Sequence, residues 1–221
     1  MPVVSQREYW DKKIREWTFA SYGKNSRIGV IEKIATYFRS VNKRKDAALK
    51  LIGPIARGKT ILDLGCGLGE FAFAILRYDP KKVLAYDISD VAIQEVKKSA
   101  KKLKTKNKIE FKTCDVSTLK QLPSCDIVVG LGFIDYLNPT QLKKLFKLIG
   151  NKPYLFSFFQ KSISLFTMLH KIYVTIQSCP GAYKYSRAEI KKFIPKGSKI
   201  FFLEQDGLLF ISNSPKIAKP L

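Results

Sequence analysis

The chain has 221 residues, of which 46% are apolar, and this is enough for one α/β domain with a buried core. No apolar run approaches the roughly 20 residues of a bilayer span, and the N-terminus lacks a signal pattern, so we expect a cytoplasmic protein. The formal net charge of +22 suits either a polyanionic partner, such as RNA or an anionic membrane surface, or merely a well-solvated lysine-rich surface. We favour the solvated surface, because lysine rather than arginine supplies most of the excess charge.

The first part of the chain has helical patterns. Residues 6–20 place apolar side chains at i, i+4 and i+7, which is one face of a helix. Further helices are expected over 27–40 and 43–52, with Gly53 and Pro54 ending the last of them. The sequence therefore predicts an N-terminal helical cap over residues 1–53.

Short apolar strands then alternate with helical segments. The expected strands are 60–64, 82–87, 108–113, 125–130 and 154–158. Ser89 and the pair Asn138-Pro139 have the residue types that begin helices between them. Such alternation predicts βαβ units and a mostly parallel sheet with helices on both faces.

The end of the chain has a different pattern. Residues 162–176 are strongly apolar and helical in length, and Ser186 to Glu189 has the spacing of a capping box. Two apolar segments, near 199–203 and 207–212, flank a turn over 204–207, which predicts a terminal β-hairpin.

A glycine loop follows the first strand directly. Its glycines are Gly65, Gly67 and Gly69, and glycine there lets the backbone approach a ligand closely. Dinucleotide enzymes use a related loop, but their pattern requires a glycine where this chain has Glu70. Asp63, two residues before the loop, would repel a pyrophosphate and suits a cationic ammonium group.

The segment Asp63-Leu-Gly-Cys-Gly-Leu-Gly69 resembles the first motif of class I S-adenosylmethionine-dependent methyltransferases. Asp87 ends the second strand, where a carboxylate can accept hydrogen bonds from both ribose hydroxyls. Asp115 follows the third strand, and in the resembling family an acidic residue there receives the adenine amino group. Each aspartate alone could also be a structural residue of a turn or a helix end. Three acidic residues at three successive strands are a more specific signal than any one of them.

The resemblance implies S-adenosylmethionine as cofactor and a Rossmann-like fold with a mostly parallel seven-stranded sheet and a C-terminal antiparallel hairpin. We expect one domain over 1–221, with a cofactor-binding core at 54–160, a substrate-side insertion at 161–195 and the hairpin at 196–213. The candidate cofactor-binding residues are Arg44, Asp63, Gly65, Cys66, Gly67, Gly69, Asp87, Ile88, Asp115, Val116, Gly130, Leu131 and Phe133. Arg44 is included because a guanidinium can bind the carboxylate of the cofactor through two hydrogen bonds. The alternative is that Arg44 lies in a solvated basic turn.

The catalytic residues and the acceptor are less defined by the sequence. Asp135 and Tyr136 follow the fourth strand, and His170 is the one histidine of the chain. We carry these three as candidate general bases, although a lone histidine on an apolar helix is more often structural. A single histidine, and cysteines without Cys-x-x-Cys spacing, indicate no metal site and free thiols.

The acceptor hypotheses come from the segment Gly130-Leu-Gly-Phe-Ile-Asp-Tyr136. In the resembling family, enzymes that methylate amino groups of nucleic-acid bases carry Asn/Asp-Pro-Pro-Tyr/Phe there, and this chain does not. We therefore expect methyl transfer to an oxygen of a small-molecule or carbohydrate- or lipid-linked acceptor. An RNA methyltransferase, a peripheral contact with a membrane and a non-catalytic binding module on the same fold are kept as alternatives.

Overall fold

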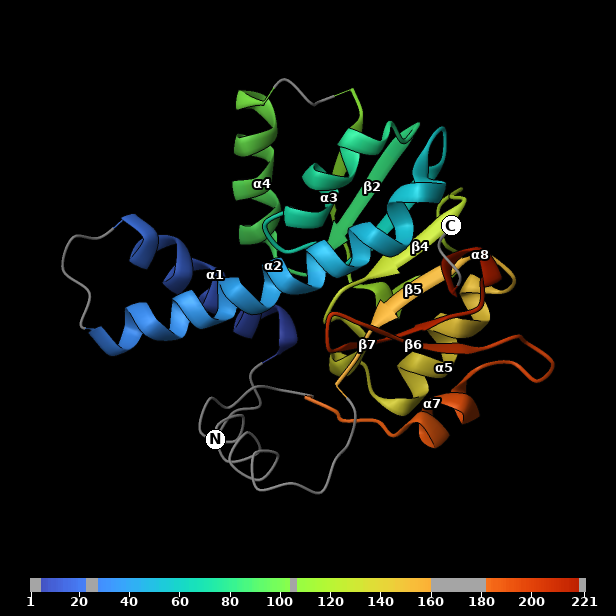
Figure 1. Ribbon diagram of the computed structural model, residues 1–221. Helices are drawn as coiled ribbons and strands as arrows, with labels where there is room; N and C mark the ends of the chain where they lie inside the picture. The colour runs from blue at the N-terminus through green and yellow to red at the C-terminus, as the bar shows by residue number, and fades with distance from the viewer. Residues whose placement is uncertain (1–4, 23–27, 104–106, 160–181, 219–221) are drawn as a thin grey trace.

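The computed structural model describes residues 5–22, 28–103, 107–159 and 182–218. Its centre is a seven-stranded sheet in the order β3-β2-β1-β4-β5-β7-β6 (Figure 1). The strands are β1 (Thr60–Leu64), β2 (Lys82–Asp87), β3 (Ile109–Thr113), β4 (Ile127–Gly130), β5 (Tyr154–Ser157), β6 (Phe201–Gln205) and β7 (Leu208–Ser212). Strand β7 runs antiparallel to both β5 and β6, while the other neighbours are parallel. This arrangement confirms the expected fold class.

Helices cover both faces of the sheet (Figure 1). Side chains of β1 alternate between the two faces: Ile61 packs into a core with α2, α3 and α4, and Leu62 packs into a core with α5 and α7. The helices are α1 (Gln6–Tyr22), α2 (Ile28–Ala56), α3 (Glu70–Ala74), α4 (Asp90–Lys102), α5 (Pro139–Ile149), α7 (Arg187–Phe193) and α8 (Pro215–Ala218), with short 3-10 helices η1 (Ile75–Tyr78), η2 (Val116–Thr118) and η3 (Ile134–Tyr136). Within the described ranges, none of these helices combines the length and apolarity needed to cross a membrane.

The helix ends follow the local signals in the sequence. Ser89 caps α4, and Asn138 and Ser186 form complete capping boxes at the starts of α5 and α7. In the hairpin, Asp206 and Gly207 form the turn with φ values of 53° and 69°. Two consecutive positive φ angles match the right-handed twist of the strands, which makes this turn a favourable hairpin connection.

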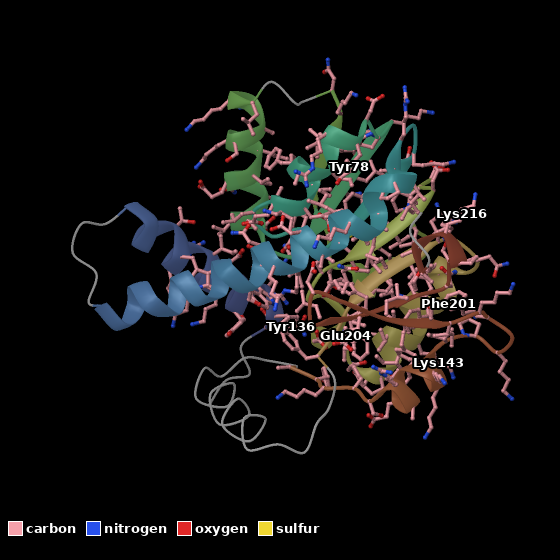
Figure 2. All side chains as sticks on the ribbon, in the orientation of Figure 1. Tyr78, Tyr136, Lys143, Phe201, Glu204 and Lys216 are labelled. Carbon is pink, nitrogen blue, oxygen red and sulfur yellow. The ribbon has the colours of Figure 1, made fainter. Side chains whose placement is uncertain are left out.

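The expectation of separate helices over 27–40 and 43–52 was wrong. One helix, α2, runs from Ile28 to Ala56 and contains Pro54 in its last turn. Pro54 has no amide hydrogen, so the last turn lacks one hydrogen bond and the helix ends two residues later. Gly53 has a packing role instead, since a Cβ atom there would lie 2.5 Å from the ring of Tyr78, which is labelled in Figure 2.

Candidate functional site

A cavity of about 150 Å³ lies beyond the carboxyl ends of β1, β2, β3 and β4. In open α/β sheets, ligands bind at this edge, where the strand order reverses on either side of the first strand. Its lining comes from the glycine loop and α3 (Asp63, Gly65, Cys66, Gly67, Glu70, Phe71), from the ends of β2 and β3 (Asp87, Ile88, Cys114, Asp115, Val116), from the segment after β4 (Leu131, Gly132, Phe133, Tyr136, Leu137) and from α1 and α2 (Gln6, Trp10, Ile14, Val41, Arg44, Lys45).

The glycine loop is held by its own backbone. Gly65 and Cys66 donate their amides to the carbonyl oxygen of Tyr86 at 2.8 and 3.1 Å. Gly65 has φ 72°, and a Cβ atom there would lie 2.8 Å from the ring of Phe133. Both the left-handed backbone and the close ring therefore require glycine at this position.

Asp63 lies under this loop, on the central strand β1, and its side chain is buried. The residue is 2% exposed, and its Oδ2 atom has no hydrogen-bond partner within the described part of the chain. Burial raises the pKa of Asp63 to about 8, and the nearby charges of Asp87 and Glu70 add to the shift. A buried carboxylate oxygen with an open acceptor position at a cavity is suited to a cationic ligand group.

Asp87 both shapes the loop and faces the cavity. Its Oδ2 accepts a hydrogen bond from the Gly67 amide at 2.8 Å, and its Oδ1 accepts one from the Ser89 amide at 2.9 Å. Burial raises the pKa of Asp87, and these two amides oppose the rise. Each carboxylate oxygen keeps further acceptor capacity, so hydroxyl groups of a ligand can still bind there.

Asp115 also has two functions. Its Oδ1 accepts a hydrogen bond from the Ser117 amide at 2.8 Å and caps η2, so the interpretation as a turn aspartate holds. The residue nevertheless lines the cavity together with its neighbours Cys114 and Val116. The three aspartates that follow successive strands in the sequence are therefore brought to one cavity.

Arg44 lies within α2 and lines the cavity, rather than lying in a solvated turn. Its guanidinium lies over the ring of Phe159, 5.6 Å from the centroid, and against Gly132. The Gly132 amide is in turn fixed by donation to Ser157 Oγ at 2.7 Å. This places a permanent cation in the lining of the cavity.

The candidate catalytic residues differ in their position relative to the cavity. Tyr136 lines the cavity, while Asp135 lies behind it and is only 5% exposed. Asp135 Oδ1 accepts a hydrogen bond from the Phe159 amide at 3.1 Å, whereas its Oδ2 has no partner in the described residues. Burial raises the pKa of Asp135 to about 7. His170 lies outside the described residues.

Two candidate cofactor residues, Gly69 and Gly130, do not line the cavity. A Cβ atom at Gly69 would lie 2.6 Å from Val96, and one at Gly130 would lie 2.8 Å from the ring of Phe156. Both glycines therefore allow close packing behind the site, which a motif cannot distinguish from ligand contact.

Sequence reasoning missed the contribution of α1. Trp10 of α1 packs edge-on against Tyr136 with ring centroids 4.9 Å apart, and Gln6 Nε2 donates to the Tyr136 carbonyl oxygen at 2.6 Å. Asp11 Oδ1 accepts from Ser89 Oγ at 2.6 Å, which attaches α1 to the start of α4. The periodicity identified the helix, but no local signal indicated which part of the fold it covers. Across the described ranges, no group of three His, Cys, Asp or Glu side chains is placed to hold a metal ion.

Comparisons with known proteins agree with this geometry. Residues 61–151 match the family model described as a methyltransferase domain. A segment of 53 residues, 24% of this chain, is 48% identical to the release factor glutamine methyltransferase of Borreliella burgdorferi, and it spans 18% of that protein's length.

Two solved structures show similar folds. The magnesium protoporphyrin IX methyltransferase from Synechocystis PCC 6803 with bound SAH has a TM-score of 0.66 at 19% identity, covering 94% of this chain and 98% of that chain. The pyocyanin biosynthetic protein PhzM has a TM-score of 0.57 at 16% identity, covering 76% of this chain and 55% of that chain.

The family match begins at β1 and includes the glycine loop, Asp87 and Asp115. The fold is similar to that of a structure that covers nearly the whole chain. Residues 61–151 therefore match a methyltransferase domain, and the chain shares the fold of methyltransferases of known structure.

Proposed function

We propose that this protein transfers a methyl group from S-adenosylmethionine to an oxygen of a small-molecule or carbohydrate- or lipid-linked acceptor. The observation that carries the proposal is the buried Asp63 Oδ2, which has no hydrogen-bond partner among the described residues and lies at a cavity that Arg44 also lines. The methionine part of the donor has an ammonium group and a carboxylate, which match these opposite charges.

The rest of the cavity suits the nucleoside part of the donor. Asp87 offers acceptor positions for the ribose hydroxyls, and Asp115 with the amide of Val116 offers both an acceptor and a donor for the adenine edge. Ile88, Leu131 and Phe133 supply apolar surface beside them. The glycine loop fits because Gly65 and Gly67 line the cavity with backbone atoms alone.

The bound donor supplies a methyl group already activated by its sulfonium. An acceptor oxygen forms the new C–O bond as the C–S bond breaks; the bonding electron pair goes to sulfur, and the acceptor's proton goes to a base. The protein's main task is to align the two reactants, since orientation alone can contribute roughly 7–11 kcal/mol to catalysis. Asp135 is our proposed base, because its Oδ2 has no hydrogen-bond partner in the part of the chain that the structure describes and its pKa of about 7 suits proton transfer near neutral pH.

The test of Asp135 uses the substitution Asp135→Asn. The amide oxygen can still accept from Phe159, but the group no longer takes a proton. We expect the methylation rate to fall by about 100-fold or more. Binding of S-adenosylhomocysteine should be unchanged, because Asp135 does not line the cavity. The wild-type rate should rise with pH up to about 7 and then level off. A rate that keeps this pH profile in the variant would exclude Asp135 as the base.

The acceptor class has two supports. The segment after β4 lacks the motif of base-amino methyltransferases, and the residues following β5 include a strongly apolar stretch at 162–176, which lies outside the described residues. Solved structures of similar fold include proteins named for a magnesium porphyrin and for pyocyanin biosynthesis. Together these observations favour a small organic acceptor.

The proposal is tested by incubating the purified protein with methyl-labelled S-adenosylmethionine and a fractionated cell lysate. Label should appear in the small-molecule or glycolipid fraction as a methyl ether or ester. A heat-inactivated sample and the Asp63→Asn variant serve as controls. Label found only in RNA or only in protein would contradict the proposed acceptor class.

RNA methylation is the second candidate, and the net charge of +22 favours it. Exposed lysines Lys97, Lys98, Lys101 and Lys102 lie along α4. A filter-binding series with RNA distinguishes the two candidates, because genuine phosphate contacts weaken binding by orders of magnitude between low and moderate salt. RNA binding that is weak at all salt concentrations would exclude RNA methylation and favour the small-molecule acceptor.

A further inference from the structure

Glu70 stands at the position where the dinucleotide motif has its third glycine. It is the first residue of α3, follows Gly69 directly, and its half-buried side chain lines the cavity. A carboxylate in a partly desolvated position is costly unless something compensates its charge. Burial raises the pKa of Glu70, and its own backbone amide and the charge of Lys45, which lines the same cavity from α2, oppose part of the rise.

Glu70 lies close enough to Asp63 to influence its ionisation. The charge of Glu70 raises the pKa of Asp63, in addition to the larger effect of burial. The ligand-free arrangement thus holds two carboxylates that destabilise each other in a low-dielectric site. Asp63 Oδ2 is buried at this cavity without a partner in the described residues, which shows that the site has capacity for a donor group.

The remaining charges of the cavity define the ligand group that fits. No group of three His, Cys, Asp or Glu side chains in the described ranges is arranged for a metal ion, so an organic cation is the better match for the two carboxylates. Arg44 and Lys45 line the cavity from α2 and provide the complementary positive side. An ammonium and a carboxylate on one carbon atom would satisfy both sets of charges.

We propose that Glu70 is a second acidic ligand, with Asp63, for the ammonium group of the methyl donor. This inference rests on the proposed function, and it assigns to this chain a specificity residue beyond the glycine loop. It makes the cavity selective for ligands that carry the intact amino-acid part of the donor over adenosine thioethers that lack it.

The test compares two ligands by calorimetry. S-adenosylhomocysteine carries the ammonium and the carboxylate, and 5′-methylthioadenosine has the adenosine and sulfur but neither charged group. We expect Glu70→Gln to lower the affinity for S-adenosylhomocysteine by about tenfold, since a charge-assisted hydrogen bond is lost. Binding of 5′-methylthioadenosine should stay within about twofold, and Glu70→Asp should give an intermediate loss for the first ligand only.

The matched control is Glu95→Gln, which removes a carboxylate from α4 outside the cavity, where Glu95 pairs with Lys98. It should leave both affinities unchanged. An equal loss of affinity for both ligands in Glu70→Gln would overturn the inference, because Glu70 would then act through the shape of the loop or the stability of the fold. Unchanged binding of S-adenosylhomocysteine would overturn it too. Failure of the wild type to bind either ligand would overturn the proposed function itself, and this is measured before any variant is made.

Discussion

The two walls of the cavity are built in different ways. The loop wall, formed by residues 63–71 with Asp87, is a continuous segment whose shape is fixed by backbone hydrogen bonds to Tyr86 and Asp87. The helix wall, formed by α1 and the middle of α2, consists of side chains that reach the cavity from far away in the sequence. Gln6, for example, donates to Tyr136, which lies 130 residues later.

This difference has an energetic consequence. The loop wall belongs to the sheet and its core, so disturbing it affects folding and ligand binding together. Among its described side chains, α1 meets the rest of the site through polar and aromatic contacts at Asp11, Gln6 and Trp10, and Ile14 is the one that is buried. Elements held by few buried apolar contacts open at lower cost than the core. We therefore expect the helix wall to affect ligand binding more than the stability of the protein.

The largest expected effect is that of Gly65→Ala in the loop wall. Alanine must adopt φ 72° there and its Cβ would lie 2.8 Å from Phe133, so both backbone strain and crowding apply. We expect the free energy of unfolding to fall by about 2–4 kcal/mol and ligand binding to be lost. Thermal denaturation and calorimetry with S-adenosylhomocysteine measure the two effects.

Its control is Gly58→Ala, which has φ 69° but no atom within 4 Å of the added Cβ and lies outside the cavity. This variant isolates the backbone strain, about 1 kcal/mol. Equal destabilisation of the two variants would show that the close ring of Phe133 is not important.

Asp63→Asn tests the charge of the loop wall. We expect affinity for S-adenosylhomocysteine to fall about 10- to 100-fold at pH 8, since a charged hydrogen-bond partner is lost. In the wild type the pKa of Asp63 is about 8 without ligand, so the group is protonated at pH 6 and must release its proton to bind an ammonium. Affinity should therefore rise between pH 6 and 8, by up to about tenfold per pH unit.

The variant should lack this pH dependence, because asparagine does not titrate. The same raised pKa also affects the ligand-free wild type. Its folded state binds a proton that the unfolded state releases above pH 4, so stability falls as pH rises from about 4 to 8. A wild-type affinity that is constant over pH 6–8 would exclude Asp63 as the ammonium ligand.

The contrast between the walls also explains what the sequence could predict. The glycine loop, Asp87 and Asp115 were found because a strand followed by particular residues determines local backbone geometry. Gln6 and Trp10 were not assigned to the site, since only the tertiary path of α1 brings them there. The helix end expected before Gly53 was wrong because a Gly-Pro pair resembles a stop signal, whereas α2 continues to Ala56 and Gly53 is required for packing against Tyr78.

Trp10→Ala tests the helix wall. Losing the edge-on contact with Tyr136 should cost about 0.5–1.5 kcal/mol, which corresponds to a loss of affinity of up to about tenfold. The melting temperature should change little, while hydrogen exchange should become faster in α1 and stay unchanged in β1. A large fall in melting temperature would show that α1 is part of the folding core, and the proposed difference between the walls would not hold.

The smallest effect is expected at the outer contact between α1 and α4. Arg7 Nη1 and Asp90 Oδ2 form an ion pair of 2.9 Å, but the two side chains are 44% and 48% exposed. Solvent screens such pairs, so Arg7→Ala should change stability by less than about 1 kcal/mol and ligand affinity by less than about twofold. Asp11→Ala is the informative comparison, since Asp11 Oδ1 accepts from both Ser89 Oγ and the Val91 amide and alanine removes this acceptor. If Arg7→Ala weakens ligand binding more than Asp11→Ala does, the surface ion pair rather than the Asp11 hydrogen bonds holds α1 against the cavity.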